Sequence, residues 1–251
     1  MLNLLAADFY KLRRCKSFYI CLGILAAVVA YIIIDFGSSS HMKEQLSPNT
    51  FHWIYMIFKE KAFLPYFMPV LQAIFITMLI TSEYNMGIIK DSVSLGFSRT
   101  KIYMSKLITI SVGSIFMMFI AILFTVITST FVFGIYGSFS MSDLLLACRM
   151  ISIQALLYTA YGSIFLMIAV LIKNIGGTMA FTIFSSLILG SLSSIIGNSY
   201  VGRILLLMNF SPVAMPHPQV KDIWIAIAAA LAYLILCSGV GGFTFKKQDI
   251  K

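Results

Sequence analysis

Charged and polar residues that could take part in chemistry gather in residues 82–106, between two long apolar stretches. Glu83 lies at the start of this segment, and Arg99 and Lys101 follow near its end. A carboxylate near such cations can form an ion pair or hold the segment against a partner protein. The same residue could instead be a solvated helix end. These roles are mechanical or structural, and none of them is catalytic.

Catalytic and metal-binding patterns are missing from the sequence. No apolar stretch contains paired carboxylates, and neither HExxH nor GxSxG occurs. The phosphate-binding pattern GxxxxGK[ST] is absent too, which predicts that this chain does not bind a nucleotide itself. His41, His52 and His217 are scattered without metal-ligand spacing, and the four cysteines form no CxxC pair. We therefore expect neither an enzyme nor a metalloprotein.

The elements that must position this segment are membrane helices. Of the 251 residues, 60% are hydrophobic and only 11% are charged, which leaves too little polar surface for a soluble domain of this length. The formal charge of +9 does not indicate a nucleic-acid binder, because the cations lie at the ends of apolar stretches without a continuous basic face. We therefore predict one all-α transmembrane domain over residues 1–251.

Six apolar stretches are each long enough to cross about 30 Å of hydrocarbon. They cover residues 18–34, 63–82, 107–133, 144–172, 178–196 and 223–243. Twelve of the 18 Lys and Arg residues fall on the side of the two termini, and six fall on the other side. This bias predicts six transmembrane helices with both termini in the cytoplasm.

Residues 2–14, ahead of the first span, form an amphipathic pattern. Five apolar residues fall on one helical face, and three polar residues fall opposite. The apolar face contains Leu2, Leu5, Ala6, Phe9 and Leu12, and the polar face contains Asn3, Lys11 and Arg14. We expect a short helix in the headgroup plane, with its basic side toward anionic lipid. The alternative is a cytoplasmic extension of the first span.

The segment between the second and third spans predicts a short cytoplasmic helix followed by a turn. Ile88, Ile89 and Val93 supply its partly apolar side. Gly96 is placed to end this helix, because glycine readily adopts the left-handed conformation of a helix stop. Ser98 then stands at the N-cap of the next helix. Such a helix, held between two spans, can transmit a push from a cytoplasmic partner, although a plain amphipathic loop on the headgroups would have the same pattern.

A second pattern lies in the fifth predicted span, where Ser186, Gly190 and Ser194 recur every four residues. Small residues at this spacing let two membrane helices approach closely. They predict a packing face, either within the bundle or against a second subunit.

Three motifs together resemble a known family. The first is Glu83-Tyr84-x-x-Gly87-x-Ile89-Lys90, continued by Gly96-x-Ser98-Arg99-x-Lys101-x-Tyr103-x-x-Lys106. The others are the opening Asp8-Phe9-Tyr10-Lys11-Leu12 and the closing Phe243-x-Phe245-Lys246-Lys247-x-Asp249-Ile250. With six spans, cytoplasmic ends and this length, the chain resembles the membrane subunits of ABC-2 type ATP-binding cassette transporters. Many members carry Thr where this chain has Ile88, a departure that leaves the expected fold unchanged.

This resemblance implies a permease subunit that exports an amphipathic peptide, drug or lipid-like substrate across a bacterial cell membrane. ATP and Mg²⁺ would bind to a separate ATPase chain, and a second permease chain, identical or paralogous, would complete the transporter. The family's ATPase contacts the N-terminal helix, here with Leu5, Phe9, Lys11 and Leu12, and the loop after the second span. The candidate coupling residues of that loop are Glu83, Tyr84, Gly87, Ile88, Ile89, Lys90, Gly96, Ser98, Arg99 and Lys101. The short length and the opening motif resemble permeases of antimicrobial-peptide resistance and lantibiotic immunity.

Two other classes of function stay open. A secondary transporter would place ionisable residues near the span centres, where this chain has no Asp, Glu, Lys or Arg. A non-transporting sensor or resistance subunit would have the same sequence features as a permease. A neighbouring gene for an ATPase would distinguish the permease from the secondary transporter.

Overall fold

The computed structural model describes residues 1–38, 50–58, 64–133, 141–196, 202–215 and 218–247. Its elements are α1 (Leu2–Arg14), α2 (Lys16–Ser38), α3 (Thr50–Ile57), α4 (Leu64–Asn85), α5 (Ile88–Ser94), α6 (Arg99–Phe133), α7 (Met141–Ile172), α8 (Ile175–Ile196), η1 (Gly202–Ile204), η2 (Leu206–Asn209), α9 (Phe210–Val213) and α10 (Val220–Lys247). The two η elements are short 3₁₀ helices. For these residues the predicted all-α class is confirmed.

Five helices of the described chain are long and apolar enough to cross a membrane, namely α2, α4, α6, α7 and α10. They correspond to the first four predicted spans and the sixth. The fifth predicted span lies in α8, where the apolar stretch of described residues runs only from Ile175 to Ile188. The predicted count of six spans is therefore not confirmed, although the described residues of each of the six predicted stretches lie in a helix.

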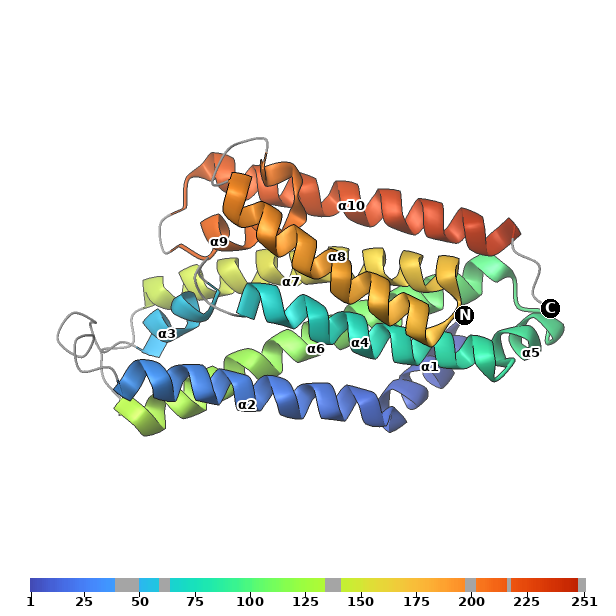
Figure 1. The fold of residues 1–251 in the computed structure, drawn as a ribbon, viewed down its shortest axis with the longest axis horizontal. Coiled ribbons are helices and arrows are strands. Elements are labelled where there is room, and N and C mark those ends of the chain that lie inside the picture. Colours follow the sequence, from blue (N-terminus) through green and yellow to red (C-terminus); the bar gives the residue numbers. More distant parts are fainter. Residues whose placement is uncertain (39–49, 59–63, 134–140, 197–201, 216–217, 248–251) are drawn as a thin grey trace.

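The long helices lie side by side in one elongated bundle (Figure 1). α4 and α7 lie inside it: α4 packs against α2, α7 and α8, and α7 also packs against α6 and α10. α2 and α10 lie at the periphery, and many of their apolar side chains are exposed. A membrane protein tolerates this exposure, because lipid tails are as apolar as the side chains that they cover.

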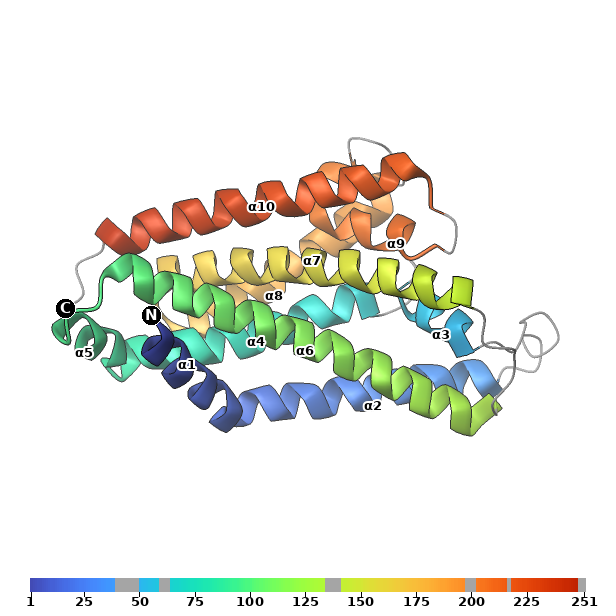
Figure 2. The same cartoon turned by 180° about the vertical axis from the view of Figure 1, so that it is seen from behind.

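The two ends of the bundle carry different short elements (Figures 1 and 2). α1, α5, the start of α6 and the end of α10 lie at one end, and α3 and α9 lie at the other. We call the first of these the α5 end. α1 and the C-terminal end of α10 are thus on the same side of the bundle, as an even number of spans requires.

α6 begins at Arg99, eight residues before the third predicted span. Its 35 residues correspond to about 52 Å at 1.5 Å per residue, well beyond the roughly 30 Å of a hydrocarbon core. A helix of this length either tilts strongly or projects past the apolar layer. Near its start it carries Ser105 and Lys106, which contact other helices at the α5 end.

Candidate functional site

Four charged side chains from three helices meet at the α5 end. Lys106 of α6 lies between two carboxylates: its Nζ is 2.5 Å from Oδ1 of Asp8 in α1 and 2.6 Å from Oε2 of Glu83 in α4. Lys11 of α1 adds a second ammonium, 3.1 Å from Glu83 Oε1 and 3.8 Å from Asp8 Oδ1. The Ser105 hydroxyl donates a hydrogen bond to Asp8 Oδ2 at 2.5 Å. We call these five residues the charged cluster.

The charged cluster is largely shielded from solvent. Asp8 and Glu83 are each 2% exposed and Lys106 is 7% exposed, whereas the Lys11 side chain is 32% exposed. Moving a charge out of water costs several kcal/mol unless it is paired and hydrogen-bonded, and two carboxylates facing two ammoniums meet this condition. Within the described residues, no group of three or more His, Cys, Asp or Glu side chains is placed to hold a metal ion. The cluster is therefore an ion-pair network that fixes how α1, α4 and α6 meet.

The charged cluster explains which face of α1 packs against the bundle. The buried residues of α1 are Leu4, Asp8 and Leu12, each four residues apart. The helix turns this face toward α6, because Asp8 finds its hydrogen-bond donors there. Of the predicted apolar face, Leu12 is buried, Leu5 and Phe9 are half-buried, and Leu2 and Ala6 are exposed. Contact of this face with lipid stays a prediction.

Glu83 does not pair with the cations that the sequence indicated. Its partners are Lys11 and Lys106. Arg99 instead donates from Nη1 to the carbonyl of α10 residue Lys246 at 2.9 Å, and Lys101 is exposed. The alternative interpretation of Glu83 as a solvated helix end is also wrong, since its side chain is buried.

A short helix follows α4 in the segment where the sequence predicted one. Gly87, at the N-cap of α5, has φ of +71°, and Gly96, just beyond its last turn, has φ of +84°. Glycine adopts these left-handed angles without steric cost, so the predicted helix stop at Gly96 is confirmed. α6 begins directly after Ser98, whose carbonyl accepts a hydrogen bond from the Ile102 N–H at 3.2 Å.

α5 packs against the bundle by one side. Ile89 is buried and Ile88 is half-buried, whereas Lys90 is exposed. Tyr84, in the last turn of α4, is half-buried, and the Nζ of Lys173 lies 5.9 Å from its ring centroid. The outer side of α5 therefore presents a charged side chain at the end of the bundle.

The start of α6 also holds the end of α10. The Tyr103 hydroxyl of α6 lies 3.5 Å from the carbonyl oxygen of Cys237, and its ring centroid lies 6.0 Å from that of Phe245. A Cβ at Gly241 would lie 2.3 Å from the Tyr103 hydroxyl oxygen, so this close approach requires glycine. Together with the hydrogen bond from Arg99, these contacts make the first turns of α6 a junction for α1, α4 and α10.

Comparison with family models identifies the chain. The model described as "ABC-2 family transporter protein" matches residues 4–215, which include α1 from Leu4 on, all of α4, α5 and α6, and all five residues of the charged cluster. The chain belongs to this family. The resemblance to ABC-2 permeases is thereby confirmed. No curated protein matches the chain.

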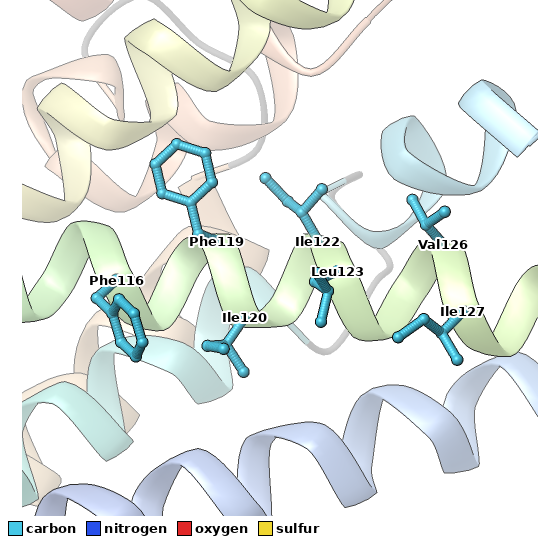
Figure 3. Close-up of a pocket in the computed structure, with 7 residues that line it drawn as sticks. All are labelled: Phe116, Phe119, Ile120, Ile122, Leu123, Val126 and Ile127. Carbon is cyan, nitrogen blue, oxygen red and sulfur yellow. The ribbon is translucent and has the colours of Figure 1, made fainter.

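A groove on α6 is a second feature of this ABC-2 family protein, with a volume of about 500 Å³. Figure 3 shows that some of its lining side chains point toward α2 and the rest to the opposite side. Seven residues line it: Phe116, Phe119, Ile120, Ile122, Leu123, Val126 and Ile127. Hydrocarbon can fill such a groove, but this lining offers no hydrogen bond that would orient a polar ligand. We therefore assign it to lipid contact.

Two buried glutamines in the middle of the bundle were not predicted from the sequence, because an uncharged amide within an apolar stretch gives no ionisable signal. Gln72 of α4 donates from Nε2 to the Tyr158 carbonyl at 2.8 Å and to the Ser114 hydroxyl at 2.5 Å. Gln154 of α7 donates from Nε2 to the Phe210 carbonyl at 2.9 Å. These hydrogen bonds tie α7 to α4 on one side and to α9 on the other. These uncharged side chains thus connect helices in the interior of the bundle.

The small residues predicted for helix packing lie in α8. Ser186 is half-buried, and its hydroxyl donates to the Thr182 carbonyl of the same helix at 2.6 Å. The side-chain surroundings of Gly190 and Ser194 lie outside the described residues. The packing face therefore stays a prediction.

Proposed function

We propose that this chain is the permease subunit of an ATP-driven exporter, and that a separate ATPase subunit binds at the α5 end of the bundle. In this proposal the chain crosses a bacterial cell membrane six times, with α8 as the fifth span and both termini in the cytoplasm. A second permease chain, identical or related, completes the transporter. The substrate is an amphipathic peptide, drug or lipid-like compound, with antimicrobial-peptide resistance as the physiological setting.

The observation that carries this proposal is the set of buried ion pairs next to α5. Only two residues separate α5 from α4, and the two helices pack together. A force on α5 therefore reaches Glu83 at the end of α4, and through Lys106 it reaches α6 and α1. Packed side chains and ion pairs of this kind can carry energetic coupling between an ATPase and membrane helices.

Exposed charges support a cytoplasmic location for the α5 end. The exposed Lys and Arg residues there come from five helices and exceed the acidic side chains exposed beside them, as the positive-inside rule predicts for a cytoplasmic face. They are Arg13, Arg14, Lys16, Lys90, Lys101, Lys246 and Lys247. ATP coupling is favoured over ion coupling, because the ionisable cluster lies at the end of the bundle. Secondary transporters bind their coupling ions near the midplane of the membrane.

Co-purification with the ATPase encoded beside the gene tests the proposal. The two chains are expressed together, extracted in mild detergent, and assayed for bound ATPase and for ATP hydrolysis. Lys90→Glu reverses an exposed charge on α5. Lys221→Glu is the matched control, because it makes the same change in the first turn of α10 at the opposite end of the bundle.

We expect the ATPase to elute with wild type and with Lys221→Glu. The Lys90→Glu variant should retain roughly fivefold less ATPase, because reversing a charge in a polar contact places like charges opposite each other and weakens association. A chain that elutes alone under every condition would contradict the proposed partnership. Equal retention by the two variants would place the ATPase contact away from α5.

A further inference from the structure

We propose that the corner between α1 and α2 is a binding site for an anionic phospholipid, whose phosphate lies against three cations of this chain. α1 ends at Arg14, α2 begins at Lys16, and Cys15 between them has an extended backbone with φ −71° and ψ 104°. Figure 2 shows the two helices meeting at an angle. The proposal does not depend on an ATPase partner.

Three exposed cations surround this corner, namely Arg13, Arg14 and Lys16. In the described part of the chain, none of the three pairs with an acidic side chain. The guanidinium carbon of Arg14 lies 4.7 Å from the ring centroid of Tyr10, which holds this cation in place. Lys11, one turn earlier, is by contrast engaged in the charged cluster. The corner therefore offers a phosphate group three charges that the described protein does not neutralise.

The surface that continues from these cations is apolar and belongs to α2. Ile20 and Ile24 follow Lys16 at intervals of four residues, which places all three on one helical face, and they are 61% and 43% exposed. Tyr10 and Tyr19 are also more than half exposed, and tyrosine is enriched where a membrane meets water. A phospholipid can thus place its phosphate at the corner and its acyl chains along α2. An acidic protein surface would match the charges but not the adjoining apolar face.

The charged cluster makes this corner a fixed site. Asp8 anchors α1 to α6 and Lys11 anchors it to α4, and Leu12 packs beside α6 within one turn of Arg14. Cations that are held in place before binding lose less conformational entropy when the anion arrives. We therefore expect a defined stoichiometry of bound lipid, and not only a general attraction to anionic membranes.

Lipid binding by the purified chain in a neutral detergent tests the proposal. The site variant combines Arg13→Gln, Arg14→Gln and Lys16→Gln. A matched control removes three exposed cations from other helices at the same end: Lys90→Gln, Lys101→Gln and Lys246→Gln. Each protein is titrated with phosphatidylglycerol, phosphatidylcholine or inorganic phosphate, and bound lipid is counted by native mass spectrometry. Thermal midpoints without added lipid verify that the variants are folded.

We expect wild type and control to bind phosphatidylglycerol in preference to phosphatidylcholine. The site variant should lose affinity on the order of 100-fold, because each cation near an anionic headgroup contributes roughly fivefold. The single change Arg14→Gln gives the same comparison with roughly a fivefold loss, should the triple variant unfold. Equal losses in the site variant and the control would overturn the site. So would equal binding of the two lipids, or displacement of the lipid by an equal concentration of inorganic phosphate, which lacks any contact with α2.

Discussion

Replacing Lys106 with methionine is the most direct test of the charged cluster. Methionine has a similar length and no charge, so Asp8 and Glu83 would stay buried without the cation that they share. Lys11 would remain, but its Nζ is 3.1 Å from Glu83 and 3.8 Å from Asp8, and its side chain is partly exposed. One partly hydrated ammonium would then face two carboxylates that repel each other.

The size of the effect follows from the burial of the two carboxylates. Breaking a buried ion pair by removing one partner costs about 3–5 kcal/mol. Because Lys106 serves two carboxylates, we expect the upper part of this range, about 4–5 kcal/mol. For a chain of this size that corresponds to a fall in the thermal midpoint of about 8–20 °C. Asp8→Asn is the milder change, about 1–2 kcal/mol, since an amide can still accept the Ser105 hydrogen bond and Lys106 keeps Glu83.

Thermal unfolding in mild detergent, followed with a thiol-reactive dye, measures these losses. Cys21 and Cys237 are free and buried, so they react when the bundle opens. Cys148 is exposed and free, and it is replaced by serine in every variant to lower the background signal.

The combination of Asp8→Asn with Lys106→Met decides whether the charges act as one network. With one carboxylate neutralised, Lys11 can pair with Glu83 alone, and we expect more than half of the lost midpoint to return. A double variant no more stable than Lys106→Met alone would refute the reasoning. So would a Lys106→Met midpoint within about 2 °C of wild type, a shift that corresponds to 1 kcal/mol or less.

Three further predictions concern packing and backbone geometry, and the same thermal assay checks them. Gly241→Ala brings a Cβ to 2.3 Å from the Tyr103 hydroxyl oxygen, and we expect a loss of about 1–3 kcal/mol that Tyr103→Phe partly restores. Gly87→Ala meets no atom within 4 Å, so its loss of about 1–2 kcal/mol is backbone strain, and Gly87→Asn loses less. Gln72→Leu stays within about 1 kcal/mol of wild type, because the Ser114 hydroxyl keeps its bond to its own helix and no buried amide is left unpaired. A loss above about 3 kcal/mol there would show that the amide bonds hold α4 to α7.

Local sequence signals predicted the elements at the α5 end. The position of α5 followed from glycines and polar residues between two apolar runs. Gly96 ends the helix because glycine adopts a left-handed backbone conformation without steric cost. The six apolar stretches are helical in their described residues for an equally local reason, since each one is long enough to form a span by itself. The exact count of spans was not settled in this way, because the described apolar stretch of α8 ends at Ile188.

The charged cluster could not be predicted in the same way. Lys106 meets Asp8 across 98 residues of sequence and Glu83 across 23, and a single sequence does not show which distant charges pair. The burial of Asp8 has the same origin. An amphipathic pattern alone does not indicate a buried carboxylate, and Asp8 is buried because its partners in α6 are buried with it.

The arrangement of contacts at the start of α6 limits how the α5 end can move. Lys106 joins α6 to α1 and α4, while Tyr103 and Arg99, one and two turns earlier, join it to α10. The ion pairs are buried, so separating any two of the helices would expose a charge to an apolar environment or require water to enter. Small displacements of α5 are therefore expected to move α1, α4 and α6 together. The helices can change their relative positions more easily farther along the bundle. There α6 packs against α2 and α7 through apolar side chains that can slide past one another.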